Sequence, residues 1–340
     1  MKKRLLSLFL ICLMLAGCAT PTLPQQKKYT ATFLDVFDTV TTIVGFAESK
    51  EAFEETTRAI HDQLRTFHQL FDIYNTYDGI NNLKVVNDAA GGAPVQVDAA
   101  VMALLKDCKT YYDLTAGKVN VAMGSVLRLW HEAREDAMDD PLHAYLPEQD
   151  ALQEAVLHTD LSKVVLDETA STVQITDPML RLDVGAVAKG WAVQRVAENA
   201  PSGLLISVGG NVCPTGAKDE NGTPWVVGIT NPDGGDYLHT IATAEHCVVT
   251  SGDYQRYFVV DGQMYHHIID PETLYPGMLW RSVTIVCADS GLADALSTAL
   301  FLLDHQQGLA LLEKCQAEAF WIDRENNRYY SPGFRDLIRT

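Results

Sequence analysis

The sequence lacks the features that mark several large classes of protein. Its seven cysteines are odd in number and widely spaced, which gives neither a disulfide framework nor a zinc-binding pattern. We expect these cysteines to be small, buried apolar side chains. It contains no internal repeat and no low-complexity run. Only 26 Lys and Arg stand against 44 Asp and Glu, and the net charge of −18 argues against a nucleic-acid partner. A Walker loop, a dinucleotide fingerprint and a Gly-x-Ser-x-Gly elbow are also missing.

What remains is the pattern of a folded α+β protein. Nearly half of the residues (47%) are apolar, and 340 residues suffice for a sizeable core. Strand patterns are present at residues 31–46, 203–208 and repeatedly through 224–286, with hairpins expected at 163–175 and 319–330. Helical spacing of apolar residues predicts helices at 48–71, 98–112, 119–134, 152–158, 183–200 and 290–303. Runs of strands with interspersed helices favour an α+β fold with largely antiparallel sheets and packed helices.

Two segments are expected to lack regular structure. Residues 71–92 are dense in Asn, Asp, Gly and Tyr, and loops of this length usually serve a function. Residues 136–150 are acidic and contain prolines, which indicates a surface insertion.

The N-terminus has the layout of a bacterial lipoprotein signal. Three basic residues precede an apolar run that is too short to span a bilayer and that ends in Leu15-Ala16-Gly17-Cys18. We therefore expect residues 1–17 to be a signal peptide, residues 18–30 a lipidated (palmitate-bearing) Cys18 with its tether, and residues 31–340 the folded domain. The protein is then exported and lipid-anchored to the outer face of the cytoplasmic membrane. An ordinary secretory signal that contains a cysteine is the alternative.

The segment Ser290–Leu303 predicts a helix with an unusual polar stripe. On a helical wheel Asp294 and Thr298 share one side with two serines, and apolar residues cover the rest. A solvent-facing side normally carries long charged side chains, whereas this one carries only short oxygen-bearing groups. A carboxylate and a hydroxyl one turn apart suit Mg²⁺, which takes few protein ligands. The alternative is a small stripe that faces water or forms buried hydrogen bonds.

Two other segments combine small residues with isolated reactive groups. Residues 182–192 (LDVGAVAKGWA) let the backbone approach an anion at a helix N-terminus, where Lys189 adds a positive charge. Tight helix packing beside a surface lysine is the alternative. Residues 250–257 (TSGDYQRY) offer hydroxyls and open backbone, and His267, before Asp270-Pro271, can serve as a general base. One alternative is that His267 is a structural histidine. Another is a hydrolase triad of Ser251, His267 and Asp270, although Ser251 does not lie in a Gly-x-Ser-x-Gly motif.

Five segments occur in a fixed order: LDVGAVAKG (182–190), SVGGNV (207–212), TSGDYQRY (250–257), HIIDP (267–271) and ADALSTA (293–299). Together they resemble the ApbE family, the FAD:protein FMN transferases, over about residues 33–301. The resemblance implies a T-fold-related architecture and Mg²⁺-dependent transfer of FMN from FAD to a Ser or Thr hydroxyl of an acceptor redox protein, with release of AMP. An FAD pyrophosphatase that gives FMN and AMP, or a non-catalytic flavin-binding lipoprotein, is the alternative.

The resemblance also implies roles for single residues. Asp294, Thr298 and the carbonyl of Ala186 correspond to magnesium ligands, and His267 corresponds to the base that deprotonates the acceptor. The flavin nucleotide is expected to be bound by Tyr77, Lys189, Gly209, Gly210, Thr250, Ser251 and Gly252. Tyr77 lies in a loop (74–82) that corresponds to the segment covering FAD. The chain departs from the family at Leu274, where a glycine often stands, and at His266, which offers a second candidate base.

Overall fold

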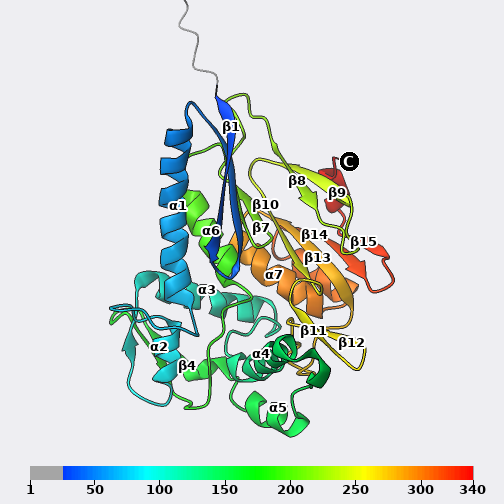
Figure 1. Ribbon diagram of the computed structural model, residues 1–340. Coiled ribbons are helices and arrows are strands. Elements are labelled where there is room, and N and C mark those ends of the chain that lie inside the picture. Colours follow the sequence, from blue (N-terminus) through cyan, green and yellow to red (C-terminus); the bar gives the residue numbers. More distant parts are fainter. Residues whose placement is uncertain (1–25, 340) are drawn as a thin grey trace, which may run out of the picture.

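The computed structural model describes residues 26–339, and its centre is an eight-stranded sheet in the order β1-β2-β6-β7-β10-β13-β14-β15 (Figure 1). Every strand in it runs antiparallel to its neighbours. The strands are β1 (Lys27–Val36), β2 (Thr39–Ala47), β6 (Leu204–Val208), β7 (Asn211–Pro214), β10 (Cys247–Gly252), β13 (Trp280–Cys287), β14 (Glu318–Asp323) and β15 (Arg328–Tyr330). The predicted antiparallel α+β architecture is confirmed.

Both faces of this sheet are covered. Side chains alternate between the faces of a strand, so Val249 joins the core beneath the helices whereas its neighbour Val248 joins a separate cluster on the other side. Helices α1 (Lys50–Phe71), α6 (Ala188–Asn199) and α7 (Ser290–Leu302) lie on the first face. The second face is covered by the ribbon of β8 (Trp225–Ile229) and β9 (His239–Thr243) together with α9 (Phe334–Leu337).

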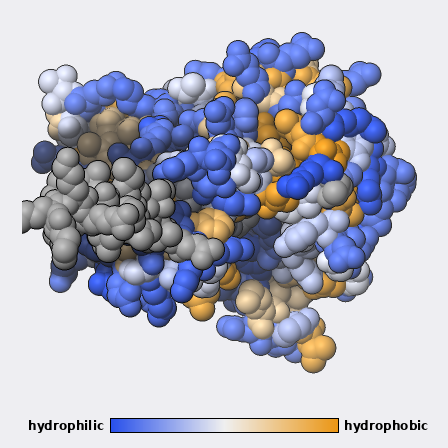
Figure 2. All heavy atoms as spheres, turned by 90° about the horizontal axis from the view of Figure 1, so that it is seen from above, coloured by the Kyte–Doolittle hydropathy of each residue, from blue (hydrophilic) through white to orange (hydrophobic). Residues whose placement is uncertain are grey.

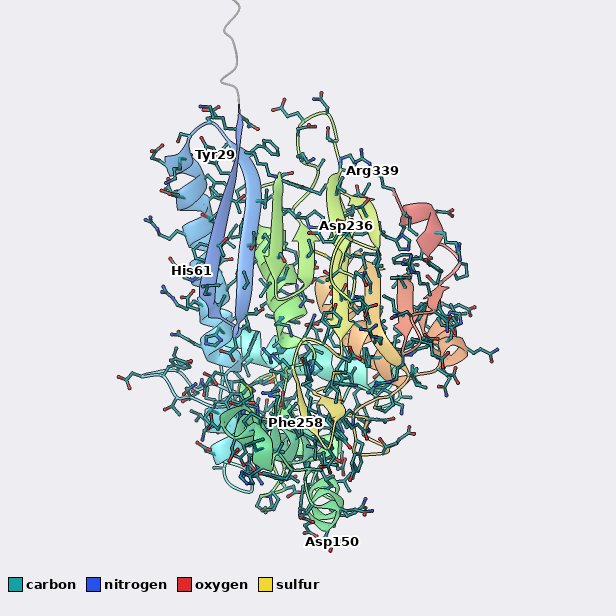
Figure 3. The ribbon with its side chains drawn as sticks, turned by 45° about the vertical axis from the view of Figure 1, so that its right-hand side comes forward. Tyr29, His61, Asp150, Asp236, Phe258 and Arg339 are labelled. Carbon is teal, nitrogen blue, oxygen red and sulfur yellow. A yellow bond between two sulfur atoms is a disulfide. The ribbon has the colours of Figure 1, made fainter. Side chains whose placement is uncertain are left out.

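A mainly helical region lies beyond one end of the sheet (Figure 1). It contains α2 (Leu83–Asp88), α3 (Ala99–Leu114), α4 (Gly124–Asp139), α5 (Gln149–Val156) and a small sheet of β3 (Val95–Gln96), β5 (Thr172–Ile175) and β4 (Val164–Asp167). The hairpin of β11 (Tyr257–Val260) and β12 (Gln263–His266) lies against it, with Phe258 packed on Trp130 of α4 (Figure 3). Helix α8 (His305–Leu312) follows α7.

The predicted elements are largely present, with four differences, two of which are explained by helix caps. Helix α2 lies within the expected loop. Its first turn is capped by the Asn82 side chain, which accepts a hydrogen bond from the backbone amide of Val85. Helix α8, which was not predicted, begins with a capping box formed by Asp304 and Gln307. Helix α4 continues to Asp139, into the expected insertion. Strand pairing begins at Lys27 rather than at residue 31, so part of the expected tether belongs to the sheet.

One pair of cysteines contradicts the expectation of unbonded thiols. Cys213 of β7 and Cys247 of β10 continue the register in which Asn211 opposes Val249, and they form a disulfide with Cα atoms 4.3 Å apart. Their separation of 34 residues gives no hint of this, because only the sheet order makes the two strands neighbours. Cys108, Cys287 and Cys315 are free, and Cys12 and Cys18 lie outside the described residues.

Leu274 adopts the backbone conformation for which a glycine is usually selected. Its φ of 65° lies in the left-handed region, which costs a non-glycine residue about 1–2 kcal/mol. Its side chain is only 3% exposed within the cluster around Trp130, whose indole donates to the Leu274 carbonyl at 2.9 Å. Burying a leucine contributes about 1.5–3 kcal/mol, enough to offset the strain. The turn therefore keeps its shape without glycine.

Among residues 26–339, no helix combines the length and apolar character needed to cross a bilayer. Figure 2 shows the end of the molecule at which the chain enters β1. This surface is mainly hydrophilic, with apolar side chains gathered in one larger area.

Candidate active site

The polar stripe of α7 faces the first turn of α6. The two helices approach closely at Gly190, where a Cβ atom would clash with the carbonyl of Ser290 and the side chain of Asp294. The Gly190 amide instead donates to a carboxylate oxygen of Asp294 at 2.8 Å. Amides in the first turn of a helix have no partner within that helix, and they favour negative charge. The glycine thus allows α6 to hold the carboxylate of α7.

Asp294 is a buried carboxylate, 5% exposed. Burial raises the pKa of Asp294, while the charge of Lys189, the Gly190 amide and the side chain of Asn211 act in the opposite direction. An ionised carboxylate in such a place is stabilised chiefly by a cation.

Three other oxygen atoms at this junction lack the hydrogen bond that would otherwise occupy them in the described part of the chain. The Asn211 Oδ1 atom is buried with no hydrogen-bond partner in the described part of the chain. Within the same residues the Thr298 hydroxyl, one turn after Asp294 on α7, forms no hydrogen bond either. The Gly190 amide donates to Asp294 and therefore does not donate to the carbonyl of Ala186, four residues earlier, as it would in a regular helix. These hard oxygens, together with one carboxylate, fit Mg²⁺ that also binds substrate phosphate.

Residues 26–339 contain no group of three or more His, Cys, Asp or Glu side chains that could hold a metal ion by themselves. A cation at this junction therefore depends on hydroxyl, amide, backbone and substrate oxygens as well as on Asp294.

The TSG segment of β10 contributes to both faces of the sheet. Ser251 faces α7, and its hydroxyl lies 2.7 Å from that of Ser297, which in turn donates to the Asp294 carbonyl. Thr250 faces the other way, with its hydroxyl 2.9 Å from that of Thr284. Its contribution to a ligand on the α7 side is therefore limited to its backbone. Gly252 ends the strand, and the ring of Tyr254 covers the space where a side chain would lie.

Gly209 and Gly210 form the tight turn between β6 and β7. Their φ values of 53° and 95° are reached most easily by glycine. A side chain at Gly209 would also clash with Thr39 of β2. The turn precedes Asn211, so the SVGGNV segment places its small residues beside the Asp294 junction.

Lys189 lies in the first turn of α6, next to Gly190. Its ammonium donates to the Gly185 carbonyl at 3.2 Å, and its charge lowers the pKa of Asp294, Asp183 and His267. A single cation therefore acts on the magnesium-ligand candidate and on the candidate base. Asp294 and His267 therefore both feel the charge of the Lys189 ammonium.

The structure distinguishes the two adjacent histidines. His266 is buried, and both of its ring nitrogens are occupied: Nε2 lies 2.7 Å from the Gly277 carbonyl, and Nδ1 accepts the Ile268 amide. His267 is half-buried, and only its Nδ1 has a partner, the Arg256 carbonyl at 3.2 Å. A carbonyl accepts only, so Nδ1 carries the proton and Nε2 is left as the acceptor. This geometry fits His267 as the base.

The environment of His267 disfavours its charged form. Burial, followed by the charges of Arg256 and Lys189, lowers the pKa of His267 to about 3. The imidazole is neutral at physiological pH, as a proton acceptor must be.

Tyr77 and Tyr74 occupy different positions in the loop 74–82. The Tyr77 hydroxyl donates to Asp72 at 2.7 Å, and burial together with Asp72 raises the pKa of Tyr77 to about 12. The Tyr74 ring packs on His131 of α4 with centroids 5.1 Å apart. Burial and Asp183 raise the pKa of Tyr74 to about 12, with Arg134 and then Arg256 acting against them. Tyr74 is therefore the tyrosine of this loop on which the charges of Asp183 and Arg256 act.

Asp183, Arg256 and Asn211 belong to the candidate site but were not among the residues expected from the sequence. Each lies in one of the five ordered segments (182–190, 207–212 and 250–257), and its polar side chain there was the available signal. Burial raises the pKa of Asp183, whereas the Gly185 amide, His131 and Arg256 lower it. The proposed hydrolase triad is not assembled, because Asp270 pairs with Lys118 at 3.0 Å and Ser251 with Ser297.

The chain is similar to known proteins over most of its length. A model of the ApbE family matches residues 37–321. The chain is 32% identical over 312 residues to the FAD:protein FMN transferase of Treponema pallidum, covering 86% of this chain and 84% of the relative. It is 27% identical over 341 residues to that of Vibrio cholerae, covering 96% of each. The solved ApbE protein of Thermotoga maritima is 28% identical, with a TM-score of 0.82 over 92% of this chain and 100% of that chain.

The contact between α6 and α7 can be tested at Gly190. We expect Gly190→Ala to lower the free energy of unfolding by about 1–3 kcal/mol, because the added methyl group must push α7 away. Urea unfolding measures the loss. Gly185→Ala is the matched control, since Gly185 is exposed and its Cβ would meet only the Asp183 side chain, at 3.1 Å. Equal midpoints for Gly190→Ala and wild type would rule out a tight contact.

Proposed function

Because this chain belongs to the ApbE family, we propose that it transfers FMN from FAD to a Ser or Thr hydroxyl of an acceptor protein and releases AMP. One observation carries the proposal: the Gly190 amide holds the buried carboxylate of Asp294 at the first turn of α6, next to Lys189. A diphosphate bound at this helix start would meet backbone amides, the Lys189 ammonium and a metal-binding carboxylate together. The named relatives are FAD:protein FMN transferases, which favours transfer over hydrolysis or simple binding.

The residues around α6 are suited to hold the diphosphate of FAD. The first turn of α6 and the Lys189 ammonium provide positive charge, and the small residues before α6 allow the backbone to approach. Asp294, Thr298 and the carbonyl of Ala186 would hold Mg²⁺, which supplies neutralisation of charge on the phosphate oxygens. Gly209, Gly210, Ser251 and Gly252 would border the nucleotide, with Thr250 contributing through its backbone.

His267 is placed to accept the acceptor's proton. Its Nδ1–H donates to the Arg256 carbonyl and fixes the ring, so Nε2 takes the proton from the Ser or Thr hydroxyl. The hydroxyl oxygen forms a bond to the FMN-side phosphorus, and the bond from that phosphorus to the bridging oxygen breaks, so AMP leaves. An imidazole with a pKa of about 3 is a weak base. The negative diphosphate offsets Arg256 and Lys189 and moves the pKa of His267 back towards its ordinary range.

We further propose that the protein is exported and anchored by lipid at Cys18. The lipoprotein motif supports this proposal, although it lies outside the described residues. The disulfide between Cys213 and Cys247 supports it independently, because disulfides persist in oxidising compartments and are rare in the cytosol. The acceptors would then be redox proteins exposed on the same side of the membrane.

The transfer activity can be tested with FAD, Mg²⁺ and a library of short peptides that each contain one Ser or Thr. We expect flavin fluorescence bound covalently to peptide, with one AMP released per FMN transferred. Asp294→Ala and addition of EDTA should each reduce transfer at least about a hundredfold, because a lost contact to transferring phosphoryl oxygens costs on the order of 3 kcal/mol.

Asp62→Ala, an exposed carboxylate of α1, serves as the control and should retain full activity. Release of AMP without labelled peptide would indicate the pyrophosphatase, and absence of both would indicate a flavin carrier. Full activity of Asp294→Ala in EDTA would refute the magnesium assignment.

The protonation state of His267 predicts a distinct pH profile at saturating Mg²⁺. Because the pKa of His267 lies below the ordinary 6.5 and a base acts only when deprotonated, kcat/KM should stay high as the pH falls through 6.5. Arg256→Gln removes a charge that disfavours the imidazolium, so the acid limb should move to higher pH. Arg58→Gln on α1 should leave the limb unchanged. A limb that stays in place or moves to lower pH in Arg256→Gln would contradict the role of His267.

The anchor is tested by labelling cells with radioactive palmitate. Wild-type protein should incorporate the label and fractionate with membranes, and Cys18→Ala should do neither, because the cysteine thiol is the site of lipidation. Equal labelling of both proteins would refute the assignment of Cys18.

A further inference from the structure

Three cysteines stand opposite one another on neighbouring strands of the central sheet. Cys247 of β10 is paired in register with Cys287 of β13 on one side, and on the other side it forms the disulfide with Cys213 of β7. Directly opposed residues of antiparallel strands have Cα atoms about 4.5–5.5 Å apart and side chains on the same face. A disulfide needs a Cα separation of about 4.4–6.8 Å. Cys247 therefore has a second cysteine within bonding reach.

All three side chains lie on the face of the sheet that the helices cover. Cys213 and Cys247 pack in the cluster that contains the buried side of α6, and Cys287 packs in the cluster that contains α7. The Cys247 sulfur lies 3.9 Å from the carbonyl oxygen of Ala288, the residue after Cys287, and 4.0 Å from the side-chain oxygen of Gln194. The disulfide therefore contacts the segment that carries the third sulfur.

The sheet order allows two disulfides within this row and excludes the third combination. Cys213 and Cys287 are separated by the width of two strand spacings, about 9–10 Å, which is beyond the reach of a disulfide. The remaining free thiols lie elsewhere: Cys108 is part of α3, and the Cys315 thiol donates to a carbonyl of α8 at 3.2 Å. Cys247 is thus the shared partner of two alternative bonds.

The Cys287 thiol is protected but has hydrogen-bond donors beside it. It is 3% exposed, and burial raises its pKa, whereas the backbone amides of Asp289 and Ala288 act in the opposite direction. The neutral thiol therefore predominates at neutral pH. Because the thiolate is the form that attacks a disulfide, reaction at this sulfur is slow in the folded protein.

We propose that Cys287 is an exchange thiol that moves the disulfide from β7 to β13. The Cys287 thiolate attacks the Cys247 sulfur, the Cys247–Cys287 bond forms and the Cys213–Cys247 bond breaks. The electron pair leaves on the Cys213 sulfur, which takes up the proton that Cys287 has lost. The row places the attacking and leaving sulfurs on opposite sides of Cys247, as such a displacement requires, and the step consumes no oxidant and no reductant.

The exchange changes which strand is covalently joined to β10. Cys213 follows Asn211 on β7, whereas Cys287 ends β13, just before the helix that carries Asp294. One bond therefore holds the strand of Asn211, and the other holds the segment that leads into α7. The two bonds close loops of similar length, so their chain-entropy contributions to stability are similar and neither pairing is strongly favoured on that ground.

The first test removes the present partner of Cys247. Cys213→Ala, refolded in a glutathione redox buffer, should contain a Cys247–Cys287 disulfide in a non-reduced peptide map and should melt close to wild type. Cys247→Ala should leave Cys213 and Cys287 as free thiols and melt several degrees lower, because neither disulfide can form. A free Cys287 in Cys213→Ala, or a bond from Cys247 to any other cysteine, overturns the inference.

The second test follows the exchange in the wild-type chain. The protein is incubated with N-ethylmaleimide in urea below the unfolding midpoint, where local openings admit the reagent, and the labelled cysteines are identified by mass spectrometry. Wild type should carry label at Cys287 or at Cys213, and Cys287→Ala should lower the labelling of Cys213 at least about tenfold, since no neighbouring thiol then releases it.

Cys315→Ala is the matched control for this labelling. It removes a different free thiol and should leave the labelling of Cys213 as in wild type. Absence of label at Cys213 in wild type, or undiminished label at Cys213 in Cys287→Ala, overturns the inference. Neither experiment uses FAD or an acceptor, so the proposed transfer is tested separately.

Discussion

The hydrogen bond from the Gly190 amide to Asp294 determines the arrangement of the candidate site. It joins the start of α6 to the middle of α7, and it exists only because residue 190 has no side chain. The same bond leaves the Ala186 carbonyl without that amide and holds a carboxylate in a buried position. Two features that suit a metal site therefore follow from one close approach of two helices. Tight helix packing was the alternative to anion binding for residues 182–192, and the structure shows that the packing itself prepares the oxygen atoms a cation would use.

Turns and amphipathic helices could be predicted because they depend on residues that are close together in the sequence. The Asp261-Gly262 turn adopts φ values of 49° and 79°, as a tight hairpin turn requires, and α1 follows from the spacing of its apolar residues. The Cys213–Cys247 pair could not be predicted, because it depends on β7 and β10 being neighbours in the sheet. Helices α2 and α8 were missed because polar caps start them within segments that otherwise resemble loops.

The candidate site was predictable to a similar degree. The helical wheel places Asp294 and Thr298 on one side of α7, and the structure puts that side against α6. Thr250 and Ser251 are adjacent in a motif, but the alternation of a strand sends their hydroxyls to opposite faces. Asp183, Arg256 and Tyr74 act on one another across elements far apart in the chain. Only the folded arrangement shows such a group of charges, since no spacing encodes it.

The disulfide has a consequence for the site that goes beyond covalent stability. It joins β7 and β10 four residues before Ser251, on a strand whose side chains alternate between the two faces. A slip of one residue in this pairing would turn the Ser251 hydroxyl away from α7 and bring a neighbour of opposite orientation into its place. The covalent bond excludes that slip. Oxidation of the two cysteines therefore fixes the strand register that turns the Ser251 hydroxyl towards α7.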